Sequence, residues 1–274
     1  MEQAKSNIVN EQLSAEAFSR QSAVFDQIYC PDSIIQYKRG RVRSHVQQYL
    51  PANSNILELN AGTGEDATWF ASQGHSVHAT DISIGMLSQL AAKAQHKDLG
   101  HKISVEQCSY TALDQLKNKG PYDLIFSNFA GLNCTGELDK VLLSFASLLK
   151  SKGMITMAIL PPFCLWETML VFKGKFRTAF RRFNSSKGAK AHVEGVNFKC
   201  WYYKPSFVVD TLKNDFDLVA VEGLCTIVPP SYIEHFAEKH PRWYKLLTRT
   251  EDRWKASWPW KYIGDYYIIT LRKK

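Results

Sequence analysis

The sequence lacks the features of a secreted or membrane-spanning protein. Its first twenty residues, MEQAKSNIVNEQLSAEAFSR, contain no apolar segment of the kind found in a signal peptide. The most apolar stretch, Met154–Phe172, contains Glu167 and the pair Pro161-Pro162, and a proline pair would break a spanning helix near its middle. We therefore expect a buried strand, a turn and an amphipathic helix in this stretch, and a cytoplasmic protein.

Patterns for metal binding and for disulfides are also lacking. The six cysteines are Cys30, Cys108, Cys134, Cys164, Cys200 and Cys225. They form no C-x-x-C pair, and none has a histidine at metal-ligand spacing, so we expect no metal site. Scattered cysteines in a chain without a leader are typical of free thiols in a reducing cytosol.

The chain also has no internal repeat and no low-complexity tract. Its 274 residues are 45% hydrophobic and 22% charged, which is ordinary for a globular protein. Its length suits one large α/β domain, or one domain that carries an inserted subdomain. Disorder is expected only in roughly the first dozen residues, which are polar and have no helical apolar spacing.

Strand-like and helix-like segments alternate through the middle of the chain. We expect strands at 55–60, 75–80, 102–108, 122–127, 154–160, 217–223 and 266–271. We expect helices at 14–28, from Asp32 or Ser33 to about Tyr49, and at 64–72, 84–94, 136–149 and 205–214. The pattern predicts an α/β fold with a Rossmann-like, doubly wound sheet, mostly parallel with an antiparallel last strand, plus helical and aromatic insertions.

Four regions follow from this pattern. Residues 1–50 would form a helical cap and 51–160 the Rossmann-like core. Residues 161–204 would form a basic, aromatic lid. Residues 205–274 would complete the core and carry a second aromatic insertion at about 230–262.

A glycine-rich turn between a strand and a helix is the most informative segment. In ILELNAGTGEDA, Gly62 and Gly64 allow a sharp bend and let backbone amides approach a ligand. Asp81 ends the next strand, 19 residues after Gly62, where a carboxylate can accept both ribose hydroxyls of an adenosine. Two alternatives remain: a structural turn without a ligand, or a nicotinamide dinucleotide site, because Gly62, Gly64 and Ala67 fit G-x-G-x-x-G/A. Glu58 inside the strand and the long helical segment before it argue against the dinucleotide.

Three segments give the chain a specific resemblance. ILELNAGTGEDA, VHATDISIGML and YDLIFSNFAGLN resemble motifs I, II and IV of the UbiE/type-11 group of class I S-adenosylmethionine-dependent methyltransferases. The family's first loop glycine is replaced by Asn60, a residue type that tolerates positive φ. An aspartate common in the family's third motif is replaced by Ser109. FCLWETMLVFKGKFRTAFRRF, VPPSYI and IGDYYIITLRK extend the resemblance to bacterial methyltransferases of unassigned substrate.

The resemblance implies a set of contacts for S-adenosylmethionine. Glu58 would order the loop and the methionine amine, and Asp81 would bind the ribose. Ile82 would pack on the adenine, and Asn128 would face the methyl-transfer site. The other implied contacts are Asn60, Ala61, Gly62 and Gly64 in the loop, Ser109 and Tyr110 near the base, and Tyr29 and Arg41 in the N-terminal helices.

One segment of the chain holds most of its net charge of +8. Between Thr168 and Val193 there is no acid, and the bases are Lys173, Lys175, Arg177, Arg181, Arg182, Lys187 and Lys190. Phe172, Phe176, Phe180 and Phe183, extended by Met169, would share one face of a basic amphipathic helix. We weigh a lid that packs this face on the core, a surface for anionic membrane or a hydrophobic substrate through 168–190, and nucleic-acid binding. Nucleic acid is disfavoured because no RNA-binding module is evident.

The second aromatic stretch, Tyr232–Trp260, favours core packing or an apolar substrate pocket, because both insertions follow strand ends. Candidate bases are His192, Tyr202 and His235, although a surface or core role fits each of them as well. The sequence therefore predicts methylation of a small, apolar or aromatic molecule on O, N or C. An NAD(P)-dependent oxidoreductase and a non-catalytic binding protein of the same fold are the alternatives. The sequence does not define the oligomeric state.

Overall fold

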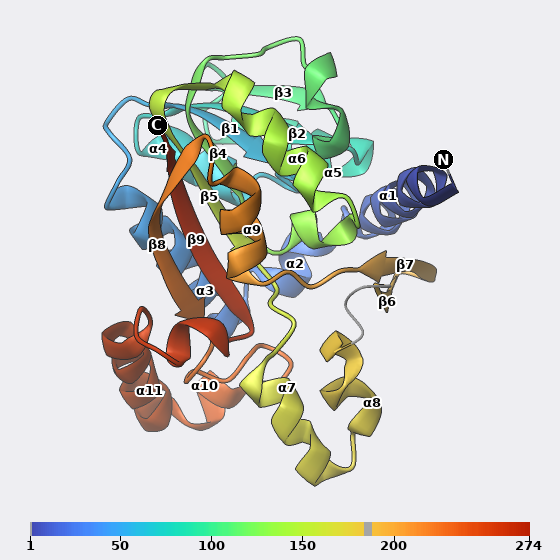
Figure 1. The fold of residues 1–274 in the computed structure, drawn as a ribbon, viewed down its shortest axis with the longest axis vertical. Helices are drawn as coiled ribbons and strands as arrows, with labels where there is room; N and C mark the ends of the chain where they lie inside the picture. Colours follow the sequence, from blue (N-terminus) through green and yellow to red (C-terminus); the bar gives the residue numbers. More distant parts are fainter. Residues whose placement is uncertain (1, 184–187) are drawn as a thin grey trace.

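A seven-stranded sheet forms the centre of the molecule (Figure 1). The computed structural model describes residues 2–183 and 188–274. The strands lie in the order β3-β2-β1-β4-β5-β9-β8, and β9 runs antiparallel to both of its neighbours. Their bounds are β1 Asn55–Leu59, β2 Ser76–Asp81, β3 Ile103–Gln107, β4 Tyr122–Ser127, β5 Leu149–Ile159, β8 Phe216–Leu224 and β9 Tyr266–Lys273. The predicted fold class, a mostly parallel sheet with an antiparallel last strand, is confirmed.

Helices cover both faces of this sheet. On one face lie α3 (Ser33–Gln47), α4 (Glu65–Ser72) and α5 (Ile84–His96), and on the other α6 (Leu138–Ser144) and α9 (Pro205–Leu212). Successive residues of a strand point to opposite faces. Ile56 therefore packs in the layer of Phe70 and Leu90, and Leu57 packs in the layer of Leu142 and Val208. Short 3-10 segments complete the core: η1 Tyr110–Gln115, η2 Gly131–Cys134 and η3 Phe145–Leu148.

The N-terminal region corrects two expectations. A helix, α1, runs over Glu2–Gln21, so the first dozen residues are helical rather than disordered. The single helix expected over 14–28 is divided, because the chain turns after Gln21 and a short α2 follows at Phe25–Tyr29. The start of α3 is as predicted, since the Asp32 carboxylate accepts hydrogen bonds from the N–H groups of Ile34 and Ile35.

The first insertion also differs from its prediction. The phenylalanines do not share one helix, because Gly174, with φ of 70°, separates η4 (Leu170–Lys173) from α8 (Phe176–Ala179). A helix α7 (Leu165–Met169) precedes them, and a hairpin of β6 (Ala189–Val193) and β7 (Val196–Cys200), not foreseen from the sequence, follows. Lys187 lies outside the described residues. The strand, turn and helix expected around Pro161-Pro162 are present as β5 and α7.

The second insertion contains α10 (Phe236–Lys239), α11 (Pro241–Trp254) and η6 (Trp260–Tyr262). In Figure 1, α7 and α8 project from the same end of the molecule as α10 and α11. No helix among the described residues is both long and apolar enough to cross a bilayer.

Candidate functional site

The turn after β1 is built from residues with unusual backbone conformations and is open on its outer side. Asn60, Gly62 and Gly64 all have left-handed φ, at 46°, 57° and 77°. A Cβ added at Gly62 would meet no atom within 4 Å, so the backbone there is bare on its outer side. The positive φ of Asn60 agrees with its place in the motif, where asparagine tolerates a conformation that most side chains avoid.

Asp81 is held at the end of β2, facing this turn. Its Oδ2 accepts the Gly62 N–H at 2.9 Å, and its Oδ1 accepts the Ser83 N–H at 2.8 Å. Burial raises the pKa of Asp81, while the backbone N–H groups of Ser83, Gly62 and Ile82 lower it. These two hydrogen bonds therefore fix the orientation of the Asp81 carboxylate beside the glycine-rich turn.

A cavity of about 130 Å³ opens between the turn and the N-terminal helices. Six of the predicted contacts line it: Asn60, Gly62, Asp81, Ile82, Tyr110 and Asn128. The lining residues that the sequence did not indicate are Ser14, Ala15, Phe18, Phe25, Ser83, Met86, Phe129, Gly131 and Cys134. Most of these come from α1, α2 and the segment after β4, whose positions depend on tertiary packing.

Glu58 lies inside β1, close behind the turn. It is buried, and its Oε2 has no hydrogen-bond partner among the described residues. Burial, followed by the nearby Asp66 carboxylate, raises the pKa of Glu58, and the charges of Arg39 and Arg43 oppose the rise. A buried oxygen without a partner is costly. It fits a site where a donor from a ligand completes the hydrogen bonding.

The segment after β4 is joined to the turn through Asn60. The Asn60 amide accepts from Ser127 Oγ at 2.8 Å and donates to the Asn128 carbonyl at 3.1 Å. A Cβ added at Gly131 would lie 2.7 Å from Asn60 Cβ and closer still to its amide group. The side chain of Asn60 thus leaves room for only a glycine at position 131.

The N-terminal helices close over the turn through polar contacts. Thr63 Oγ1 donates to Asp26 Oδ1 at 2.6 Å, and the hydroxyls of Ser19 and Ser83 lie 2.7 Å apart. Ser109 lies on the other side of the cavity, outside its lining, where Glu11 of α1 accepts from it and from Thr111 Oγ1. Burial raises the pKa of Glu11, and the two hydroxyl donors lower it.

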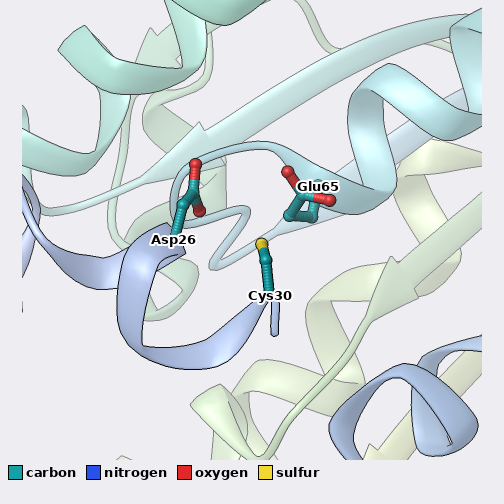
Figure 2. Close-up of side chains that lie close together, drawn as sticks. All are labelled: Asp26, Cys30 and Glu65. Atoms are coloured by element: carbon teal, nitrogen blue, oxygen red, sulfur yellow. The ribbon is translucent and has the colours of Figure 1, made fainter. Parts of the chain in front are cut away.

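A group of possible metal ligands lies at the same junction. Figure 2 shows Asp26 and Cys30, from α2 and the residue that follows it, directed toward Glu65 at the start of α4. Lys93 already places its ammonium 2.6 Å from Asp26 Oδ2 and 2.5 Å from Glu65 Oε1. The lysine supplies the cation that these carboxylates need, so we assign no metal to them.

The structure places Arg41, one of the expected contacts, away from the cavity. Its guanidinium pairs with Glu222 at 3.2 Å and Glu251 at 3.4 Å on the far side of α3. Two residues correspond to about 200° around a helix, so Arg39 lies on the opposite side of α3 and lines a neighbouring cavity. Arg39 pairs with Asp66, and its guanidinium lies 4.6 Å from the ring centre of Phe129.

A second cavity of about 240 Å³ adjoins the first and shares Phe18, Phe25 and Phe129 with it. The remaining lining residues are Tyr29, Ile35, Lys38, Arg39, Ser231 and Tyr266. Tyr29 therefore lies beside the neighbouring cavity rather than in the one lined by Asp81. A larger cavity, near His78 and Lys102, lies at the amino ends of the strands. Open parallel sheets bind ligands at the opposite, carboxyl ends.

None of the three candidate bases lines either of the two adjoining cavities. His192 is exposed on the β6–β7 hairpin, 3.0 Å from Asn197 Oδ1. Tyr202 is buried against the guanidinium of Arg182, and His235 precedes α10 on the surface. Glu58, Ala61 and Gly64, the remaining expected contacts in and behind the turn, do not line the cavity that contains Asp81.

Comparisons with known proteins agree with this geometry. Residues 56–153 match the family model of a methyltransferase domain. No curated protein matches the chain. Among solved structures, a protein described as an S-adenosylmethionine-dependent methyltransferase from Listeria monocytogenes is 17% identical, with a TM-score of 0.60 over 86% of this chain and 98% of that one.

Two other similar structures contain S-adenosylhomocysteine. One is 1,6-didemethyltoxoflavin-N1-methyltransferase from Burkholderia thailandensis, 14% identical, with a TM-score of 0.55 over 96% of this chain and 88% of that one. The other is magnesium protoporphyrin IX methyltransferase from Synechocystis, 17% identical, with a TM-score of 0.54 over 87% and 83%. At these identities the similarity establishes the fold.

Proposed function

We propose that the chain binds S-adenosylmethionine and methylates a small molecule, because residues 56–153 match the family model of a methyltransferase domain and the fold is that of known S-adenosylmethionine-dependent methyltransferases. The observation that carries the proposal is the open turn at Gly62 beside a fixed Asp81, with Glu58 behind it, whose buried Oε2 has no partner within residues 2–183 and 188–274. These groups fit the ribose and the methionine amine of the cofactor. The roles proposed for individual residues toward the cofactor and the methyl acceptor rest on this proposal.

Each part of the cofactor has a suitable partner in this arrangement. Asp81 would accept from the ribose hydroxyls, and Glu58 would meet the positively charged amine. Ile82 and Tyr110 border the cavity on the side proposed for adenine. The Tyr110 hydroxyl is buried and has no hydrogen-bond partner in the part of the chain that the structure describes, so a ligand atom there would satisfy it.

The adjoining cavity is the proposed site of the methyl acceptor. It meets the cofactor cavity at Phe18, Phe25 and Phe129, which would exclude water from the reacting atoms. Its aromatic lining favours a small apolar or aromatic acceptor. The chemistry would occur at the boundary between the two cavities.

The residues around the acceptor cavity favour catalysis by alignment. The cofactor supplies a methyl group on a positively charged sulfur that is already a good leaving group. Burial raises the pKa of Tyr29, and burial likewise raises the pKa of Tyr266, to about 12, although Lys38 opposes the rise. Neither hydroxyl ionises near neutral pH, so positioning an acceptor in line with the methyl group would provide most of the rate.

The two alternatives, an NAD(P)-dependent oxidoreductase and a non-catalytic binding protein, predict different properties. A nicotinamide dinucleotide fold has the strand order 3-2-1-4-5-6, whereas here an antiparallel β9 lies between β5 and β8. We therefore favour S-adenosylmethionine over NAD(P). A non-catalytic binding protein would bind the cofactor without turnover. The proposed compartment is the cytosol, because all six cysteines lie in described segments and are free.

The test measures binding first and transfer second. Calorimetry with S-adenosylhomocysteine and with NADH separates the two cofactors, and transfer of labelled methyl groups to a cell extract separates an enzyme from a binding protein. Asp81→Ala should weaken S-adenosylhomocysteine binding by about 10- to 100-fold, because it removes a charged hydrogen-bond acceptor.

Asp123→Ala is the matched control for this variant. Asp123 accepts the Asn55 N–H at 2.8 Å at the opposite end of β1, so its loss should leave affinity unchanged. Unchanged affinity in a folded Asp81→Ala protein would refute the placement of the ribose.

A further inference from the structure

The first insertion exposes large apolar side chains. We call Met169–Phe183 the tip; in Figure 1 its helices project away from the sheet. Phe172 is 87% exposed, Phe176 58%, Phe180 52% and Phe183 53%, and Met169 is 46% exposed. Contiguous exposed apolar surface of this kind marks an interaction site more often than a free surface.

Buried ion pairs fix the face that the tip presents. Arg182 is 2% exposed, and its guanidinium reaches Glu167 Oε1 at 2.6 Å and Asp265 Oδ1 at 2.7 Å. Arg181 adds a contact to Glu167 Oε2 at 3.0 Å, and Lys38 meets Asp265 Oδ2 at 2.8 Å. Turning the phenylalanines inward would break this network and leave buried charges unpaired. The arginines therefore anchor the segment, and the aromatic side chains face outward.

Positive charges alternate with the exposed rings. Lys173, Lys175 and Arg177 are exposed and form no ion pair within the described chain, and the tip contains no acidic residue. Unpaired bases next to apolar rings match a surface that is anionic outside and apolar beneath, as in a bilayer leaflet with acidic headgroups. A nucleic acid would contact the basic side chains of the tip but would leave most of the exposed phenylalanine surface in water.

The second insertion adds aromatic side chains at the same end of the molecule. Trp243 is 62% exposed and Trp258 is 80% exposed, and α11 lies at the end from which α7 and α8 project (Figure 1). Tryptophan is enriched at the boundary between lipid and water. Two separate segments thus present residues suited to one interface.

We propose that the tip docks this protein on an anionic lipid surface. The rings of Phe172 and Phe176 enter the headgroup region, and Lys173, Lys175 and Arg177 contact the acidic lipids. The inference concerns a surface separate from the cofactor cavity, so it stands or falls independently of methyl transfer.

Vesicle flotation tests the proposal with the full chain. We expect binding to phosphatidylcholine vesicles that contain phosphatidylserine, weak binding to phosphatidylcholine alone, and release by added salt. Lys173→Glu with Lys175→Glu, and Phe172→Ser with Phe176→Ser, should each reduce binding at least about tenfold. All four positions are exposed, so the variants should keep the thermal stability of the wild type.

Matched controls change equivalent side chains elsewhere. Leu143→Ser, at a residue 57% exposed on α6, and Lys97→Glu, at the end of α5, should bind vesicles like the wild type. The proposal is overturned by absence of wild-type binding at low salt, or by equal losses in tip and control variants. It is also overturned if the tip instead mediates self-association or RNA binding, seen as a concentration-dependent mass or RNA retention without vesicle binding.

Discussion

The contact between Asn60 and Gly131 allows a quantitative test of how the turn is built. Gly131→Ala places a Cβ against the Asn60 side chain, 2.7 Å from its Cβ, at a position where the backbone φ itself is not left-handed. Overpacking of this kind costs about 1–3 kcal/mol. We expect the free energy of unfolding to fall by that amount in the single variant.

Asn60→Gly removes the obstacle and introduces the glycine found in the motif that this segment resembles. It loses the hydrogen bonds with Ser127 and Asn128, each worth about 0.5–1.5 kcal/mol, and it relieves the left-handed φ of 46°. In this background Gly131→Ala has room for its methyl group. The double variant should therefore be close in stability to Asn60→Gly alone.

Urea unfolding of the wild type, both single variants and the double variant gives the coupling energy directly. We expect the two substitutions to offset each other by about 1–3 kcal/mol. Additive effects, within about 0.5 kcal/mol, would refute the steric explanation for Gly131. They would show that this backbone shifts without cost when a side chain is added.

Two further predictions concern buried carboxylates. Burial raises the pKa of Glu222, but the hydrogen bond with His45 and the neighbouring charges lower it to about 2. The ionised form of Glu222 therefore stabilises the fold above pH 4.5, and this contribution is lost as the pH falls toward 2. Glu222→Gln should lower the free energy of unfolding by roughly 3 kcal/mol at pH 7. Urea unfolding should show that the difference in this free energy between variant and wild type decreases below pH 4.5. A difference that does not depend on pH would contradict this explanation. Glu11→Ala removes the acceptor for Ser109 and Thr111, so hydrogen exchange of the α1 amides should accelerate at least about tenfold, while that of β1 stays unchanged. Equal exchange in α1 before and after substitution would show that these bonds do not hold the helix.

The sequence was sufficient where apolar spacing determines structure. The strands of the core and the turn with Gly62 and Asp81 are close to their predicted positions, because their alternation and loop chemistry are local properties. The start of α1 was missed because its buried face is polar. The side chains of Asn10, Glu11 and Ser14 are buried and form hydrogen bonds rather than apolar contacts. The sequence therefore has no helical spacing of apolar residues here from which the helix could be predicted.

Two other errors have tertiary causes. The four-residue spacing from Phe172 to Phe180 suggested a core-facing stripe, but Gly174 interrupts the helix and Arg182 takes the buried position. The choice between Arg39 and Arg41 depends on how α3 is rotated about its axis. That rotation is set by packing on the sheet and cannot be judged from the spacing of two arginines.

The polar underside of α1 has a consequence for turnover. The cofactor cavity is small, at about 130 Å³, against roughly 300–1,000 Å³ for typical ligand sites. If the chain binds S-adenosylmethionine as proposed, we expect α1 to move away from the turn when the cofactor enters or leaves. In that movement Asn10 and Glu11 would exchange their partners outside α1 for water, and hydrogen bonds to water would replace most of the energy lost. Surfaces held together by hydrogen bonds separate at a lower cost in free energy than apolar surfaces, which would suit the proposed exchange of cofactor and product.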